Sequence, residues 1–191
     1  MIDLYSYVFR ALVTEESLDN AGRLNKRKQQ AADIELQYEQ LGMNDMDPNI
    51  VEIAETMTIV YTAIHSFENT VRSFITQKLQ EEKGTDWWEK SVKKEIRTRA
   101  EQRRDSEQAI RWHSARGENL IDYTEFGDLV SIISGNWNLF EAHISNIDWA
   151  KEIIGTIEKS RNVIMHGGTL KKTDTERVGM YIRDWLRQVG S

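Results

Sequence analysis

The chain has 191 residues, of which 39% are apolar and 29% charged, a composition that predicts a globular protein with a substantial core. It contains no cysteine, which excludes disulfide bonds and thiolate zinc sites. Because no segment resembles a signal peptide or an apolar membrane span, we expect a cytoplasmic location. Eleven glycines and one proline leave few breaks, which favours helices over short strands.

The beginning of the chain is predicted to be a helical arm, residues 1–45, followed by a helical domain at residues 46–191. The helix of the arm, in one or two pieces, carries an apolar stripe and then a polar middle. Because this middle is too polar to be buried throughout, we expect the arm either to brace the domain or to pair with a second subunit. The stripe consists of Tyr5, Val8, Phe9, Leu12 and Val13, and the middle contains the small basic patch Asn25–Lys28.

The clearest helical period lies in residues 48–83, which we predict to form one uninterrupted helix at the centre of the core. Asp47 and the proline after it are suited to begin this helix, and Gly84 is suited to end it. Its apolar positions recur at intervals of three and four: Ile50, Ile53, Ala54, Met57, Val60, Tyr61, Ile64, Val71, Phe74, Ile75 and Leu79.

Glu68 and Arg72 lie four residues apart on the same predicted helix, which is the better orientation for an ion pair within a helix. One interpretation is an exposed pair worth roughly a few tenths of a kcal/mol. The other is functional: a carboxylate at this position would orient the guanidinium of Arg161 if the two helices pack together.

A strongly basic segment follows at residues 90–116, with nine Lys and Arg against four Asp and Glu. Two interpretations stay open. The segment is either a solvated helical face or a basic arm that follows a phosphate backbone, with Trp112 and His113 at its far end. The candidate RNA-binding residues in it are Lys93, Lys94, Arg97, Arg103, Arg104 and Arg111.

The rest of the chain also shows helical patterns, so the predicted fold class is all-α. Asp148 is a candidate N-cap for one helix, and Thr173 with Glu176 predicts a capping box at the start of the last helix. No pair of histidines or acids has the spacing of a metal site. His65 and His143 are expected to be surface or edge histidines rather than ligands.

The residues with the most distinctive chemistry lie in the stretch 160–168, which contains Arg161, Asn162 and His166. An apolar-periodic segment leads into it, and two glycines after His166 predict the end of the helix there. Asn162 and His166 share one face, and Arg161 lies on its flank. A guanidinium, an amide and an imidazole together can stabilise a phosphate and move protons around it. The alternative is a capped helix whose histidine only compensates the helix dipole.

Taken in order, these features resemble the HEPN superfamily, small all-helical domains whose ribonuclease members carry an R-x(4–6)-H motif late in the sequence. The motif here is Arg161–His166, and the similarity covers about Asn49 to Gly190. The chain resembles the branch found on yeast nuclear transcript-surveillance endonucleases and on many bacterial defence proteins. Besides the motif, the similarity rests on Glu68, Arg72, Trp87, Trp88, Tyr123, Phe126, Gly127, Asp128, Leu129, Asn136, Trp137 and Phe140.

This resemblance implies a metal-independent endoribonuclease without a cofactor, active as a homodimer in which two motifs meet at the interface. RNA supplies its own nucleophile, the 2′-hydroxyl. His166 would take or return a proton, Arg161 would stabilise the growing phosphoryl charge, and Asn162 would hold the histidine or the phosphate. The expected products are a 2′,3′-cyclic phosphate and a 5′-hydroxyl. Since one histidine cannot easily be both acid and base, a second from the partner subunit is chemically attractive.

The same resemblance also implies an alternative, because many HEPN domains are non-catalytic modules for RNA or nucleotide binding or for dimerisation. The net charge of −6 counts against RNA binding unless the basic segment lies near His166 in space. The similarity to bacterial defence proteins raises the expectation of a role in phage defence or as a toxin. An antitoxin or a regulatory protein would then be a partner.

Overall fold

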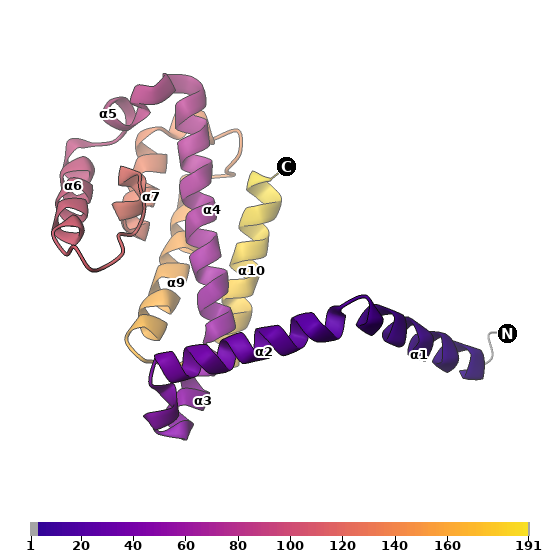
Figure 1. The fold of residues 1–191 in the computed structure, drawn as a ribbon. Helices are drawn as coiled ribbons and strands as arrows, with labels where there is room; N and C mark the ends of the chain where they lie inside the picture. Colours follow the sequence, from indigo (N-terminus) through magenta and orange to yellow (C-terminus); the bar gives the residue numbers. More distant parts are fainter. Residues whose placement is uncertain (1–3, 191) are drawn as a thin grey trace. The chain divides into compact units, whose positions relative to one another are not determined.

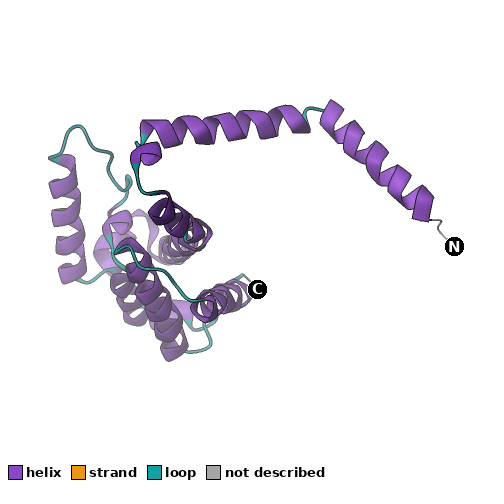
Figure 2. Cartoon of the chain, turned by 90° about the horizontal axis from the view of Figure 1, so that it is seen from below, coloured by secondary structure: helices purple, strands orange, loops and turns teal. Residues whose placement is uncertain are grey.

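The computed structural model describes the backbone of residues 4–190 and the side chains of residues 7–22 and 32–190. Every regular element within these residues is a helix, and Figure 2 shows helices joined by loops with no strand among them. The predicted all-α class is therefore confirmed.

Contacts define two compact units, Met1–Ile53 and Ala54–Ser191. The predicted division into residues 1–45 and 46–191 stays a prediction. In the first unit the predicted N-terminal helix is in two pieces, because Gly22 turns the chain with a φ of +97°, which glycine adopts without steric cost. The elements of this unit are α1 (Leu4–Asn20), α2 (Arg23–Gln40), the 3-10 helix η1 (Met43–Asp45) and most of α3 (Pro48–Thr56).

The apolar stripe predicted on the first helix is exposed wherever its side chains are described. Phe9 is 65% exposed and Leu12 is 59% exposed. Tyr5 and the basic patch Asn25–Lys28 belong to helical segments whose side chains lie outside the described residues.

The second unit is built around α4 (Thr58–Lys83), which lies beside α9 and α10 in Figure 1. Aromatic rings join these three helices. The Trp185 ring of α10 meets Phe67 of α4 edge-to-face at 5.7 Å and stacks on Trp149 of α9 at 5.7 Å. Such pairs each add about 0.5–1.5 kcal/mol to the burial of their area. The apolar residues of α4 that are buried are Val60, Ile64, Phe67, Val71, Phe74, Ile75 and Leu79.

The prediction of one uninterrupted helix over residues 48–83 is wrong, because the helix is interrupted at Met57, between α3 and α4. The Met57 N–H bonds three residues back, to the Ala54 carbonyl at 3.0 Å, which tightens the last turn of α3. The Met57 sulfur accepts a hydrogen bond from the Leu170 backbone at 3.3 Å. The apolar period continues across the break, so it did not reveal the break. Ile50 is 66% exposed on α3 rather than buried.

The remaining helices complete the bundle around α4. In Figure 1, α6 and α7 lie side by side, and α7 also packs against α9. Beyond α4 the elements are η2 (Gly84–Asp86), α5 (Trp87–Ser91), α6 (Lys94–Gln108), η3 (Leu120–Tyr123), α7 (Phe126–Gly135), α8 (Trp137–Phe140), α9 (Ile147–Met165) and α10 (Lys172–Val189).

Helix ends fall close to their predicted positions, with two corrections. Asp47 accepts from the Asn49 N–H at 2.9 Å, as its predicted capping role requires. The N-cap of α9, however, is Asn146, whose side chain accepts from Trp149 N–H at 2.7 Å, and not Asp148. The capping box predicted from Thr173 is also absent from the described structure, because the N-cap of α10 is Lys171, two residues earlier, and it makes no side-chain bond.

Candidate active site

The motif helix α9 ends as predicted. His166 is its C-cap, and Gly167 follows with a φ of +77°. Gly167 N–H bonds to the Ile164 carbonyl at 3.0 Å and Gly168 N–H to the Val163 carbonyl at 2.8 Å, the two bonds of a Schellman motif. A Cβ on Gly168 would lie 2.9 Å from the Val163 oxygen, so this close turn also needs the second glycine. The exposed imidazole of His166 thus sits at the negative end of the helix dipole.

Arg161 and Asn162 line a pocket of about 620 Å³, which we call the motif pocket. From α4, Glu68 and Arg72 line the same pocket, so the structure brings these four predicted residues together. His166 is not among the lining residues. The others are Tyr61, His65, Asn69, Arg116, Asp122, Thr124, Glu125, Phe126 and Glu158.

Glu68 lies between two arginines in this pocket. Its Oε1 accepts from Arg72 Nη2, and its Oε2 is 3.9 Å from Arg161 Nε. Arg72 is held further by the Thr124 carbonyl at 3.0 Å and by Asn69 Oδ1 at 3.2 Å. Since Glu68 is only 8% exposed, the ion pair is not a solvated surface pair. The arrangement fits the predicted alternative, a carboxylate that orients Arg161.

Arg161 itself is loosely held. Its side chain is 40% exposed, and among the described residues it has only the long contact with Glu68 and makes no hydrogen bond. A guanidinium carries five N–H donors, so most of those on Arg161 remain available to a ligand. The pocket therefore presents a partly exposed cation with free hydrogen-bond donors.

Glu158 is a pocket residue that the sequence reading missed. It lies one turn before Arg161 and Asn162 on α9. Burial raises the pKa of its carboxyl, and the nearby carboxylate of Glu125 raises it further, against the opposing charge of Arg161. Its spacing of three and four residues from the motif was a signal that would have found it.

Three further pocket residues were not predicted from the sequence. They lie on the side of α4 that lines the pocket, at intervals of four residues: Tyr61, His65 and Asn69. The rings of Tyr61 and His65 stack with centroids 5.9 Å apart and planes 22° apart. Asn69 Nδ2 lies 3.2 Å from His65 Nε2. The period of four was visible in the sequence, but it did not show which face of α4 meets the motif.

The basic helix α6 is largely neutralised by acids. Asp128 of α7 is buried and accepts from Arg99 and, at 3.3 Å, from Arg103, while Arg103 also lies 2.9 Å from Glu125. Burial alone would raise the pKa of Asp128. Hydrogen bonds from Arg99, from the Glu125 backbone and from Arg103 outweigh burial and lower the pKa.

The candidate RNA-binding residues do not line the motif pocket. The residue of the basic segment that lines the pocket is Arg116, the last in the segment. Its Nε contacts Glu107 of α6. The RNA-binding role of the six residues stays a prediction. Lys93, Lys94 and Arg111 are exposed, Arg97 is half-buried, Arg103 is paired as above, and Arg104 lies 3.0 Å from Asp105.

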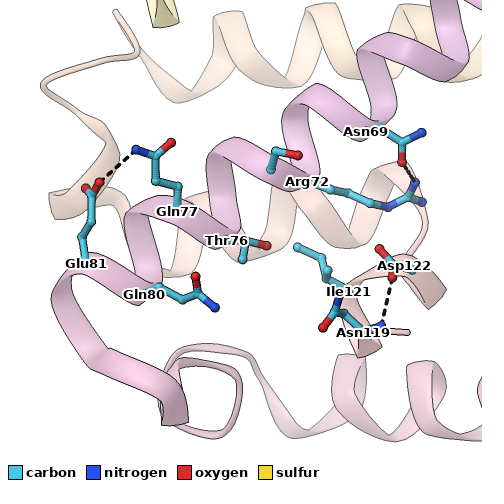
Figure 3. Close-up of a pocket in the computed structure, with 10 residues that line it drawn as sticks. Asn69, Arg72, Thr76, Gln77, Gln80, Glu81, Asn119, Ile121 and Asp122 are labelled. Carbon is cyan, nitrogen blue, oxygen red and sulfur yellow. Dashed lines mark hydrogen bonds between the residues drawn. The ribbon is translucent and has the colours of Figure 1, made fainter. Parts of the chain in front are cut away.

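A polar groove of about 720 Å³ continues from the motif pocket between α4 and η3, and Figure 3 shows its lining side chains. The pocket and the groove share Asn69, Arg72 and Asp122. Amides and hydroxyls dominate the groove, and Figure 3 shows Ile121 from η3 across from Thr76 of α4. Its other lining residues are Ser73, Gln77, Gln80, Glu81 and Asn119.

Two structural features are absent from the described part of the chain. Within it, no group of three or more histidine, aspartate or glutamate side chains is placed to hold a metal ion. No helix in it is both long and apolar enough to cross a membrane.

The described helical bundle, with the R-N-x-x-x-H motif at the end of α9, agrees with the predicted resemblance to HEPN domains. The sequence model described as Swt1-like HEPN matches residues 62–190, and the chain therefore belongs to this family. Comparisons with curated proteins and with solved structures gave no match. Membership points to a function related to RNA or nucleotides, since HEPN domains commonly dimerise and bind RNA and are often ribonucleases.

Proposed function

We propose that this protein is a metal-independent endoribonuclease that uses the 2′-hydroxyl of RNA as its nucleophile. The observation that supports this most is the state of Arg161. Its side chain is 40% exposed, makes no hydrogen bond to any described residue, and lies 3.9 Å from the buried carboxylate of Glu68. An anion-binding residue in a ribonuclease needs these properties, whereas a structural arginine uses its donors within the protein.

In the proposed reaction the 2′-oxygen attacks the adjacent phosphorus, and the bond from phosphorus to the 5′-oxygen breaks. The proton of the 2′-hydroxyl goes to a base, and the leaving 5′-oxygen receives a proton. Arg161 stabilises the charge that grows on the phosphoryl oxygens, and Asn162 holds the phosphate or the histidine. His166 transfers a proton. The products are a 2′,3′-cyclic phosphate and a 5′-hydroxyl.

The proposal includes a homodimer in which the motif faces of two chains meet. His166 lies outside the lining of the motif pocket in its own chain, while its imidazole is exposed at the end of α9. A two-fold axis beside that end brings a second Arg161, Asn162 and His166 to one cleft. Sedimentation at micromolar concentration tests this, and a stable monomer of 22.3 kDa that retains activity contradicts it.

The proposed substrate is a single-stranded segment of RNA. The polar groove that continues from the motif pocket has amide and hydroxyl groups suited to unpaired base edges. Arg116 brings the end of the basic segment to the same pocket. A cytoplasmic role in phage defence or as a toxin, with an antitoxin or regulatory partner, belongs to this proposal.

The alternative is a non-catalytic HEPN module that binds RNA or nucleotides or mediates dimerisation. The position of His166 outside the pocket lining favours it, as does the net charge of −6. In this alternative the motif pocket holds a phosphate group without cutting RNA.

A cleavage assay separates the two functions. Single-stranded RNA should be cut by the wild-type protein in EDTA, and the products should end in a 2′,3′-cyclic phosphate. A single 2′-deoxynucleotide at the cut position should block the reaction, because the nucleophile is missing. Arg161→Ala and His166→Ala should each abolish cleavage without changing the far-ultraviolet circular dichroism. RNA binding without cleavage supports the module instead, and loss of activity in EDTA contradicts metal independence.

A further inference from the structure

His65 is a residue of the motif pocket to which the proposed reaction assigns no role. It lies in the same pocket lining as Arg161 and Asn162. It is one turn before Glu68 on α4, and Glu68 is the residue that faces Arg161 across the pocket at 3.9 Å. His65 is therefore close enough to act on a ligand held by Arg161.

The hydrogen bonds of Asn69 decide how His65 can act. Arg72 Nη1 is 3.2 Å from Asn69 Oδ1, and because a guanidinium only donates, this atom must be the amide oxygen. The amide nitrogen then points to His65, 3.1 Å from its carbonyl oxygen and 3.2 Å from Nε2. An amide nitrogen only donates, so His65 Nε2 accepts this bond and the ring proton resides on Nδ1.

The ring of His65 also stacks on the ring of Tyr61, with the two ring planes 22° apart. Among the described residues, none accepts a hydrogen bond from His65 Nδ1, and the side chain is exposed. The ring is thus oriented by Asn69 and Tyr61, with Nε2 as the acceptor and the N–H of Nδ1 left as a donor for a ligand.

We infer that His65 is a substrate-binding residue of the proposed ribonuclease, donating a hydrogen bond from Nδ1 to a phosphoryl oxygen of the RNA. This inference rests on the proposed function. The chain of bonds from Glu68 through Arg72 and Asn69 to His65 fixes the donor before the substrate arrives. Because the Asn69 amide already occupies Nε2, His65 does not transfer protons in this arrangement; it contributes a fixed donor to the reacting phosphate.

Different substitutions of His65 test whether Nδ1 is the donating atom as well as whether the residue is needed. An asparagine at position 65 places its amide nitrogen near the position of Nδ1, whereas a glutamine reaches further, toward the position of Nε2. We expect His65→Asn to keep kcat/KM within about threefold of wild type, and His65→Ala and His65→Gln to lose roughly tenfold or more, as a lost bond to a charged group predicts. The matched control is Ser66→Ala, an exposed neighbour on α4 outside the pocket lining.

Two readouts complete the experiment. Cleavage of a fluorescent single-stranded RNA gives kcat/KM across pH, and anisotropy with the same RNA carrying one 2′-deoxynucleotide at the cut position gives binding. The donor role predicts that His65→Asn keeps the wild-type pH–rate profile. Loss of one limb of that profile in His65→Asn reveals proton transfer and overturns the inference. Wild-type rates in His65→Ala, or equal losses in His65→Asn and His65→Ala, also overturn it.

The outcomes for the two proposals are distinguishable. A wild-type protein that neither cuts nor binds RNA contradicts the proposed function and the role of His65 together. A wild-type protein that cuts RNA, with His65→Ala equally active and Arg161→Ala inactive, leaves the proposed function in place and removes His65 alone. Circular dichroism of each variant verifies the fold. Because His65 is exposed on α4, we expect the fold to tolerate its substitution.

Discussion

Arg161 of the motif pocket and the arginines that join the basic helix α6 to α7 have the same chemistry but opposite surroundings. Asp128, with its side chain only 8% exposed, holds Arg99 and Arg103, and Glu125 adds a second contact to Arg103. Arg161 has one long contact at 3.9 Å and no hydrogen bond to a described residue. Helix α6, which contains more Lys and Arg than any other helix, therefore uses two of these side chains, Arg99 and Arg103, to contact α7.

The contrast shows that a cation is available to a ligand according to its partners and not according to the local count of Lys and Arg. An arginine whose donors end on a buried carboxylate and on backbone carbonyls must break those bonds before it binds a phosphate. Arg161 has no such bonds to break. The comparison predicts loss of activity from changes at the motif pocket and loss of stability from changes at the contact between α6 and α7.

The largest effect is expected at Arg161. Arg161→Ala should lower kcat/KM for single-stranded RNA by at least about a hundredfold, because a charged donor to the reacting phosphate is lost. Arg161→Lys should recover only part of the loss, since an ammonium lacks the two-edged fork. The matched control is Arg99→Ala, which should keep the rate within about threefold. Equal losses in the two alanine variants would remove the distinction between the regions.

The next effect is on stability. Asp128→Asn should lower the free energy of unfolding at pH 7 by about 2 kcal/mol, because two arginines lose a buried carboxylate while remaining partly solvated. The lowered pKa means that the Asp128 carboxylate stabilises the fold above its unfolded-state pKa and loses this effect as the pH falls through the folded-state value. Urea unfolding should show the variant and wild type converging toward pH 3. A constant difference down to that pH contradicts the carboxylate as its origin.

A moderate effect is expected from substitution of Glu68, whose carboxylate lies between Arg72 and Arg161 in the motif pocket. Glu68→Gln keeps the shape of the side chain but removes the charge that orients Arg161 and Arg72. We expect roughly a tenfold fall in kcat, with RNA affinity unchanged or stronger because a negative charge has left the pocket. Weaker RNA binding together with an unchanged kcat would show that Glu68 does not position Arg161.

A smaller effect is expected from the exposed lysines at the start of the basic segment. Lys93→Gln together with Lys94→Gln should weaken RNA binding a few fold and reduce the slope of log K against log salt by up to about 1.4, if both lysines contact single-stranded phosphates. Anisotropy at several salt concentrations measures the slope. An unchanged slope assigns the exposed part of the basic segment to a solvated face, which was the other interpretation of its sequence.

The smallest effect concerns Glu158. Because burial and neighbouring carboxylates raise the pKa of this group, its ionised form opposes folding, so its cost is absent at low pH and appears as the pH rises through the folded-state pKa. Glu158→Gln should therefore stabilise the protein at pH 7 by about half a kcal/mol, after allowance for solvent screening, and not at pH 4. Thermal unfolding at the two pH values measures this difference. Stabilisation of equal size at both pH values would exclude ionisation as the cause.

What the sequence determined by itself is local. The period of three and four predicted the helices, and the glycines after His166 predicted the end of α9, because both depend on bonds between residues a few positions apart. The motif residues Arg161 and Asn162 were identified in the same way. The cap of α9 at Asn146 was missed because two nearby residues suited the role and only the backbone conformation separates them.

The tertiary structure alone decided which charges are paired and which side chains enter the motif pocket. Arg99 meets Asp128 29 residues away, and Arg72 meets the Thr124 carbonyl 52 residues away. Such pairs depend on distances across packed helices, which leave no period or spacing in the sequence. His65 shows the same limit: its four-residue interval with Asn69 was readable, but the face of α4 that meets α9 is set by how the whole core packs.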